Sequence, residues 1–194
     1  MKNNTFKEIL LPAIMLFVIA LVCTALLAST NMVTADKIAE LEVRASMEAK
    51  IAVFPDAASF SDENTIDYNG SKIPYYEALD SEGNVIGYVF ATTTKSYGGD
   101  ISCMVGISCK DNKITGVELT TINDTPGLGM KAKGEDFLKQ YRDRSGKIGV
   151  NKNEKTDTEI QAISGATITS KAVTTAVNDA FGAYELIKAG ECNG

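Results

Sequence analysis

Charged residues are absent from a long apolar stretch near the N-terminus. Residues 9–28 carry no charge, and the next charged residue is Asp36. Twenty helical residues are about 30 Å long, which matches the hydrocarbon core of a bilayer. The pattern therefore predicts a transmembrane helix over residues 9–28, preceded by a short N-terminal segment, residues 1–8.

A cleaved signal peptide is the alternative for this stretch. The apolar region of a signal peptide usually has only about 7–15 residues, and residues 28–30 make a weak cleavage site. Residues 20–23 resemble a lipoprotein box, although Val22 stands where a small residue is required. We therefore predict a retained membrane anchor.

Apolar residues recur at helical spacing beyond the anchor, with charges between them. These apolar positions are Ile38, Leu41, Met47 and Ile51. Thr34 suits the N-cap of this helix, and Pro55 ends it. We expect a stalk helix over residues 29–54 that continues from the anchor, which leaves residues 55–194 as one folded domain.

The domain begins with a polar segment, residues 56–69, that reads as a loop. The chain then alternates between β-branched or aromatic runs and turn residues, which is typical of antiparallel strands. Strands are predicted over residues 75–79, 85–92, 101–109 and 114–122. A short helix over residues 135–141 and a polar stretch over residues 142–158 follow. The fold class is therefore α+β: an N-terminal transmembrane helix, then an antiparallel sheet flanked by helices.

The last helix has one apolar face, made by Val173, Val177, Ala180, Phe181, Tyr184 and Ile187. A cluster of hydroxyl and small residues, 164–170, comes directly before it. The first N–H groups of a helix have no partner within the helix, and with the macrodipole they attract phosphate. Thr169 and Ser170 are the candidate N-caps. The alternative is a capped loop that binds nothing.

Composition excludes several classes of function. The net charge is −6 and the pI is about 4.8, so a nucleic-acid partner is not expected. The chain has no histidine, which removes histidine-based catalysis and histidine-ligated metal sites. Its four cysteines form no Cys-x-x-Cys pair, so iron–sulfur and c-type haem ligation lack their usual spacing. A redox role therefore needs a bound organic cofactor.

Two short motifs resemble those of the FMN-binding domain family. The segment Ser-Gly-Ala-Thr-Ile-Thr-Ser, residues 164–170, resembles its flavinylation motif, in which FMN is joined to a threonine through the phosphate. The segment Asp-Thr-Pro-Gly-Leu-Gly, residues 124–129, resembles its Glu-Thr-Pro-Gly-Leu-Gly loop. With one N-terminal membrane segment and this chain length, the sequence resembles the G subunits of the Rnf complexes, which are relatives of the C subunit of the sodium-pumping NADH–quinone oxidoreductase.

The resemblance implies a role for each motif residue. Thr167 is the expected attachment threonine, with Thr169 the nearest alternative. Phosphate contacts are expected from Ser164, Thr169 and Ser170, with Lys131 or Lys171 offsetting the charge. Gly165 and Ala166 keep the backbone open beside the phosphate. The contacts expected for the flavin ring come from Thr125, Gly127, Leu128, Gly129 and Tyr97, with Tyr88 a further candidate.

The glycines of the upstream loop have a specific expected use. Pro126 fixes its own φ, whereas Gly127 and Gly129 can adopt positive φ and let the backbone approach a flat ring closely. Two positions depart from the family pattern. Gln161 replaces an acidic residue of the family pattern, which the resemblance implies is recognised by a flavin transferase, the enzyme that attaches FMN. Asp124 replaces the usual glutamate.

The resemblance also implies a function. The chain would be the electron-transfer subunit of an ion-translocating ferredoxin:NAD oxidoreductase, with covalent FMN. Its partners would be the other membrane and peripheral subunits, a flavin transferase and the membrane itself. Lys2 and Lys7 precede the span, and Lys37 and Arg44 follow it, which only slightly favours a cytoplasmic N-terminus. The resemblance implies the same orientation, with the FMN domain on the extracytosolic face.

Two other functions fit the same residues. One is an anchored FMN carrier that serves a reductase outside any ion pump. The other is an anchored binding domain without a cofactor, in which the threonine motif only caps a helix.

Overall fold

The computed structural model describes residues 3–191, apart from the side chains of residues 3–8, 36, 39, 190 and 191. The outermost residues of the predicted N-terminal segment and of the predicted domain lie outside this range. The chain divides into two compact units between Arg44 and Ala45. This boundary precedes the predicted domain start at residue 55, because the last turns of the stalk helix pack against the sheet of the second unit.

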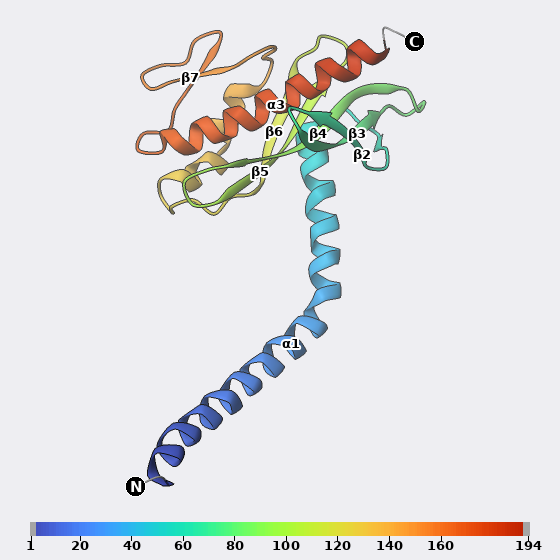
Figure 1. Cartoon of the computed structure of the whole chain (residues 1–194). Helices are drawn as coiled ribbons and strands as arrows, with labels where there is room; N and C mark the ends of the chain where they lie inside the picture. Colours follow the sequence, from blue (N-terminus) through green and yellow to red (C-terminus); the bar gives the residue numbers. More distant parts are fainter. Residues whose placement is uncertain (1–2, 192–194) are drawn as a thin grey trace. The chain divides into compact units, whose positions relative to one another are not determined.

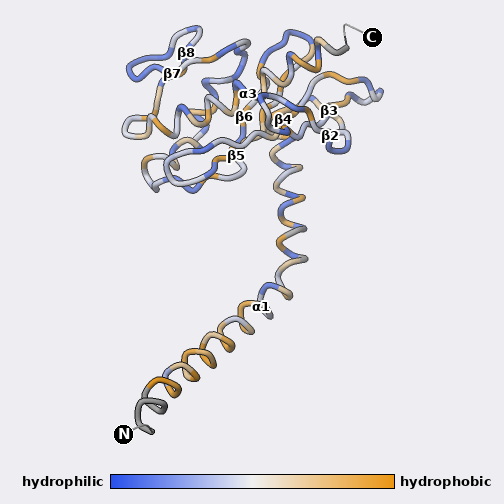
Figure 2. Tube along the Cα trace, viewed as in Figure 1, coloured by the Kyte–Doolittle hydropathy of each residue, from blue (hydrophilic) through white to orange (hydrophobic). Residues whose placement is uncertain are grey.

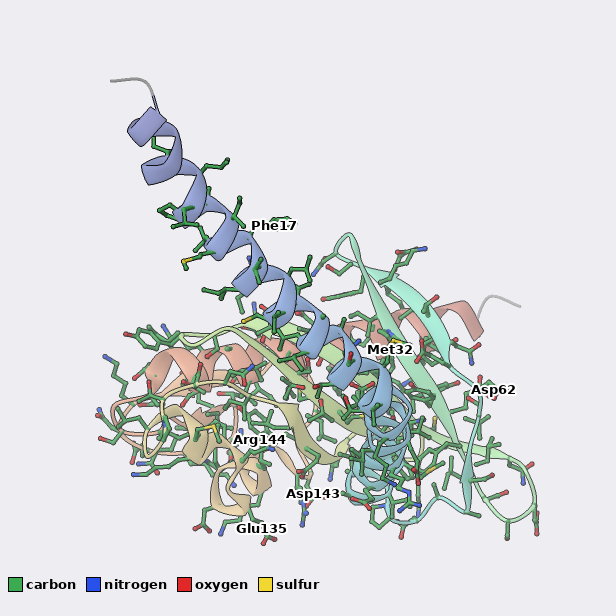
Figure 3. The ribbon with its side chains drawn as sticks, turned by 90° about the horizontal axis from the view of Figure 1, so that it is seen from below. Phe17, Met32, Asp62, Glu135, Asp143 and Arg144 are labelled. Carbon is green, nitrogen blue, oxygen red and sulfur yellow. The ribbon has the colours of Figure 1, made fainter. Side chains whose placement is uncertain are left out.

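Most of helix α1 forms the N-terminal unit. Helix α1 runs from Asn3 to Val53 without a break, and its segment Ile9–Ala35 is long and apolar enough to cross a membrane. Figure 2 shows the hydrophobic residues gathered in the N-terminal half of α1, and side chains such as Phe17 project outward (Figure 3). The apolar segment and the stalk are thus one continuous helix. The N-cap predicted at Thr34 is wrong, because its hydroxyl donates to the carbonyl of Thr30 within the helix (2.9 Å).

The C-terminal unit is built on an antiparallel sheet, which has six strands in the described chain. Their order across the sheet is β1-β3-β4-β5-β6, and β2 also pairs with β3. The four predicted strands are confirmed as β3 to β6, with small changes at their ends. The strands are β1 (Ser59–Phe60), β2 (Asn64–Tyr68), β3 (Ser71–Leu79), β4 (Val85–Lys95), β5 (Asp100–Ser108) and β6 (Ile114–Thr121).

The loop predicted over residues 56–69 is wrong, since it contains β1 and β2. Strand β2 forms a hairpin with β3 through Asn69 and Gly70, whose φ angles are 51° and 77°. Two successive positive φ angles are typical of a type I′ turn, for which Asn-Gly is a preferred sequence. The strand's polar composition concealed it, because only Ile66 and Tyr68 are even partly buried.

Helix α3, Thr167–Glu191, lies along one face of the sheet and packs on β4 and β5 (Figure 1). The predicted apolar face is confirmed: its residues are buried, except for Ile187, which is half-buried. Facing it are Tyr88 and Phe90 of β4 and Cys103 and Val105 of β5. Tyr88 contacts Tyr184 there, so it belongs to the core rather than to a cofactor site.

The last turns of α1 cover the opposite face of the sheet. Ala49, Val53 and Phe54 pack there against side chains that alternate with those facing α3, namely Tyr76, Ala78, Val89 and Met104. The hydroxyl of Thr115 donates to the carbonyl of Val53. Both faces of the sheet are therefore buried, one by each long helix.

The segment between β6 and α3 is irregular but well anchored. The predicted helix over residues 135–141 is found as α2 (Glu135–Leu138) and the 3₁₀ turn η2 (Lys139–Tyr141), preceded by η1 (Gly129–Lys133). The stretch predicted to be only polar contains β7 (Gly149–Asn151), which pairs in parallel with β8 (Glu159–Gln161).

Arg144, which is labelled in Figure 3, joins the parts of this segment through hydrogen bonds. Its buried guanidinium donates to the carbonyls of Gln140, Thr156, Asp157 and Glu159, at 2.6–3.1 Å. These acceptors lie at the end of η2 and around β8, so a single cation fixes the strand that leads into the threonine motif. A pattern of polar residues alone gives no sign of such a contact.

Candidate cofactor site

The two sequence motifs meet at one cavity. Its volume is about 590 Å³, within the range of small-molecule sites. The walls come from the β4–β5 loop, the segment after β6 and the first turn of α3. The lining residues are Tyr97, Asp124, Thr125, Leu128, Gly129, Gly165, Ala166, Thr167, Ile168 and Thr169.

The upstream motif forms a tight turn. The N–H of Leu128 donates to the carbonyl of Thr125 (3.2 Å), and between them stand Pro126 and Gly127. Gly127 has φ of 76°, as the third residue of a type II turn requires. The expected use of Gly127 is confirmed in this respect.

Gly129 serves a different purpose from the one expected. It does not adopt positive φ, and it is buried. A Cβ at this position would lie 2.5 Å from Cβ of Asp124 and 2.8 Å from Oγ1 of Thr169. Glycine is needed there because the two motifs approach each other across its backbone.

The threonine motif contains a similar turn. The N–H of Ala166 donates to the carbonyl of Ile163 (2.9 Å), and Gly165 has φ of 78°. Helix α3 begins at the next residue, and the first helical bond runs from the N–H of Ser170 to the carbonyl of Ala166. The predicted N-cap at Thr169 or Ser170 is therefore wrong, because the helix starts two to three residues earlier.

The hydroxyl groups of the motif have different partners. Ser170 is buried, and its hydroxyl donates to the carbonyl of Ala166 and accepts from the N–H of Ile163 (3.0 Å each). Thr169 is 2% exposed and donates to Oδ2 of Asp124 (2.6 Å). Thr167 is half-buried, and its hydroxyl has no hydrogen-bond partner within the described chain. Thr167 thus offers an uncommitted hydroxyl to the cavity.

Asp124 joins three segments around the cavity. Its carboxylate accepts hydrogen bonds from Ser96 Oγ (2.5 Å), the N–H of Gly98 (2.6 Å) and Thr169. Burial by itself raises the pKa of Asp124, but the bonds from Ser96, Thr169 and Gly98 outweigh it and hold the pKa below 3.8. The side chain is only 3% exposed and remains ionised at neutral pH.

Apolar side chains are unusually exposed around the cavity. Tyr97 is 74% exposed, Ile168 58% and Leu128 43%. Of the described side chains beyond α1, few large apolar ones are this exposed, and these three share one cavity. Exposed apolar groups gathered around a pocket are typical of a binding site.

Comparison with known proteins agrees with this site. Residues 96–182, which include every residue lining the cavity, match the FMN-binding domain family. Residues 1–49 match the RnfG N-terminal region. The G subunit of the Na⁺-translocating ferredoxin:NAD⁺ oxidoreductase complex of Acetobacterium woodii is 37% identical, over 93% of each chain.

This chain belongs to the RnfG family, the G subunits of ion-translocating oxidoreductase complexes. The G subunit of the ion-translocating oxidoreductase complex of Methanosarcina acetivorans is another relative, 34% identical over 90% of this chain and 93% of its own length.

Solved structures show the same fold at low identity. The C subunit of the Na⁺-translocating NADH–quinone reductase of Parabacteroides distasonis has a TM-score of 0.54 and 19% identity, covering 65% of this chain and 76% of its own. NqrC of Shewanella oneidensis has a TM-score of 0.52 and 20% identity, covering 73% and 74%. The α+β fold class predicted from the sequence of this chain is therefore confirmed.

Most residues singled out in the sequence lie at the cavity. Those that line it are Tyr97, Thr125, Leu128, Gly129, Gly165, Ala166, Thr167 and Thr169. Ser164, Gly127 and Ser170 belong to the turns and the helix start rather than to the lining. Sequence reasoning missed Asp124 and Ile168 as lining residues. Both residues lie within the two motifs, so their place in the sequence could have indicated that they line the cavity. That these residues bind a cofactor remains a prediction.

Proposed function

We propose that this chain is the FMN-carrying electron-transfer subunit of a membrane-bound, ion-translocating ferredoxin:NAD oxidoreductase complex. Its FMN is joined through the phosphate to the hydroxyl of Thr167. The single observation that carries the proposal is the cavity in which both family motifs meet around that uncommitted hydroxyl. The resemblance of the whole chain to the G subunits supports the assembly with other subunits.

The start of α3 suits a phosphate. The N–H groups of Thr167, Ile168 and Thr169 precede the first helical hydrogen bond, and the macrodipole adds partial positive charge there. Lys131 and Lys171 are exposed nearby in sequence and can balance the charge of the phosphate. The hydroxyl of Thr167 is the group from which a phosphoester forms, and the N–H groups can donate to the phosphate oxygens.

The remainder of the cavity suits a flat, mainly apolar ring. Gly129 and Gly165 remove side chains that would fill the space: a Cβ on Gly165 would come within 3.1 Å of Cδ2 of Leu128. Leu128, Ile168 and Tyr97 offer apolar surface that is otherwise left to water. Burying part of this surface would contribute about 25 cal/mol for each Å² removed from water.

The chain's own residues bind and orient the cofactor rather than carry out redox chemistry. FMN, when bound, accepts and donates one or two electrons. Attachment through the phosphate leaves the ring unmodified and would prevent loss of the cofactor from an extracytosolic domain. The apolar segment of α1 carries no charge, so we infer that ions cross the membrane through other subunits.

We further propose that the N-terminus is cytoplasmic and the FMN domain extracytosolic. The lysines on either side of the span give only a weak bias, so this orientation rests mainly on the resemblance. A flavin transferase on the same side of the membrane would then attach FMN, despite Gln161 in place of the usual acidic residue.

Intact mass spectrometry of the full chain from its native membrane tests the attachment. The wild type is expected to carry an added mass of one FMN less one water, with flavin fluorescence that survives denaturation. Thr167→Val is the matched control, because it keeps the shape of the side chain and removes the hydroxyl. A wild-type chain without the added mass, in cells with active flavin transferase, would leave the binding-domain function as the better account.

A further inference from the structure

Two threonines of the same motif line the cavity, and only their surroundings differ. Thr167 and Thr169 both lie in the first turn of α3. Thr167 is half-buried, and its hydroxyl has no partner within the described chain. Thr169 is almost fully buried and donates to Asp124. The residue type alone therefore does not explain why one threonine and not the other would be modified.

We propose that Asp124 determines the attachment site. It binds the hydroxyl of Thr169 and prevents its modification, which leaves Thr167 as the reactive hydroxyl. This inference rests on the proposed attachment of FMN. It assigns to Asp124 a selecting role that is separate from any contact with the flavin ring.

The lack of space around the Thr169 hydroxyl supports this assignment. The Thr169 oxygen lies 2.6 Å from Oδ2 of Asp124 on one side. On another side, even a Cβ on Gly129 would come within 2.8 Å of it. A phosphoryl group is larger than a methyl group. Approach of a phosphorus atom to this oxygen would require the two motifs to separate.

Charge acts in the same direction. The carboxylate of Asp124 is held by Ser96 and Gly98 as well as by Thr169, so it cannot easily turn away. A phosphate joined to Thr169 would stand beside this buried anion, and like charges at such a distance repel strongly in a poorly solvated site. Thr167 has no carboxylate as a partner, so it lacks this penalty.

The attachment step itself is a phosphoryl transfer. The Oγ of the threonine forms a bond to the phosphorus of an activated flavin nucleotide, whose phosphate is joined to a leaving group through an anhydride. The bond to the leaving group breaks, and the hydroxyl proton ends on that group. No electron is gained or lost by the flavin.

An alternative hypothesis for the Asp124–Thr169 pair makes Asp124 a general base that activates Thr169. This alternative predicts attachment at Thr169 instead.

The test maps the attachment site by peptide mass spectrometry on full chains from cells that contain flavin transferase. The variants are Thr167→Val, Asp124→Ala/Thr167→Val and Asp124→Glu/Thr167→Val. We expect wild type to carry FMN on Thr167 only, and Thr167→Val to carry none. In the Ala double variant, occupancy of Thr169 should be at least about tenfold above the detection limit that bounds Thr167→Val, which corresponds to at least about 1.4 kcal/mol of discrimination removed.

The Glu double variant is the matched control, because it keeps a carboxylate of the length usual in this loop. In this variant Thr169 should stay unmodified, as it does in the wild type. Far-UV circular dichroism verifies that each variant is folded. Attachment at Thr169 in the single Thr167→Val variant would overturn the inference, as would equal occupancy in the Ala and Glu variants or none in a folded Ala variant. Wild type without FMN would overturn the proposed attachment itself.

Discussion

Single residues at this site are strongly constrained by what they contact. Asp124 is buried, which costs free energy for a charged group, yet three donors surround its carboxylate. Hydrogen bonds to a charged group contribute about 1.5–3 kcal/mol each when the group would otherwise be unpaired. The same three bonds join the β4–β5 loop, the upstream motif and α3, so one side chain determines the shape of the cavity wall.

Asp124→Asn should lower the free energy of unfolding at pH 7 by about 1–3 kcal/mol. The folded state depresses the pKa of Asp124, so its stabilisation is complete above the unfolded pKa and is lost as the pH falls through the folded pKa, below 3.8. The difference between wild type and variant should therefore shrink as the pH falls below about 4. Urea unfolding of the full chain in detergent, from about pH 7 to about pH 3, measures this difference. A constant difference would contradict the assigned charge state.

At the scale of elements, the last turn of α1 and the sheet are joined by close backbone packing within the second unit. The end of α1 lies against Gly106 of β5 and Gly116 of β6, which pair with each other. A Cβ on Gly106 would come within 2.5 Å of the Val53 carbonyl oxygen, and a Cβ on Gly116 within 2.9 Å of Val53 Cα. Glycine in these strands is thus explained by the helix that covers them.

Gly106→Ala should destabilise the domain by about 1–3 kcal/mol, because the helix end must move or the strand must bend. Gly83→Ala is the comparison: its φ of 85° strains alanine, but nothing lies within 4 Å of the added Cβ. Gly83→Ala should cost only about 1 kcal/mol. Thermal unfolding of both variants gives the two values. A smaller effect at Gly106 than at Gly83 would mean that the helix end does not pack on the sheet as described.

For the molecule as a whole, the anchor changes how the domain meets its partners. Tethering to the membrane confines the domain near other membrane subunits. This confinement raises the effective concentration of the domain toward those subunits without any new contact. The cavity and its exposed apolar wall belong to the domain, whereas the segment Ile9–Ala35 of α1 is long and apolar enough to cross a membrane.

The proposed orientation can be tested on intact cells with a membrane-impermeant amine reagent. Lys110 and Lys152 are exposed on the domain and should be labelled. Lys2 and Lys7 precede the span and serve as internal controls, which should react only after the membrane is opened. Peptide mass spectrometry separates the two groups. The reverse pattern would place the domain in the cytoplasm.

The sequence by itself determined the features that depend on neighbours along the chain. The anchor follows from an uncharged run, and the four long strands and α3 follow from local periodicity. The two turns follow from Pro126, Gly127 and Gly165, whose backbone preferences act locally. The hairpin at Asn69–Gly70 was also readable in this way, but the polar strand before it concealed the signal.

Only the tertiary structure decided which groups are free. Asp124 and Thr169 are 45 residues apart, and Asp124 and Ser96 are 28 apart, so no local pattern relates them. Gly129 is needed for the space between the two motifs, not for its own φ. Thr167 and Thr169 are identical as residues, and they differ because folding brings a carboxylate to one and none to the other. Hydrogen bonding and steric exclusion act between atoms in space, and periodicity along the chain does not record them.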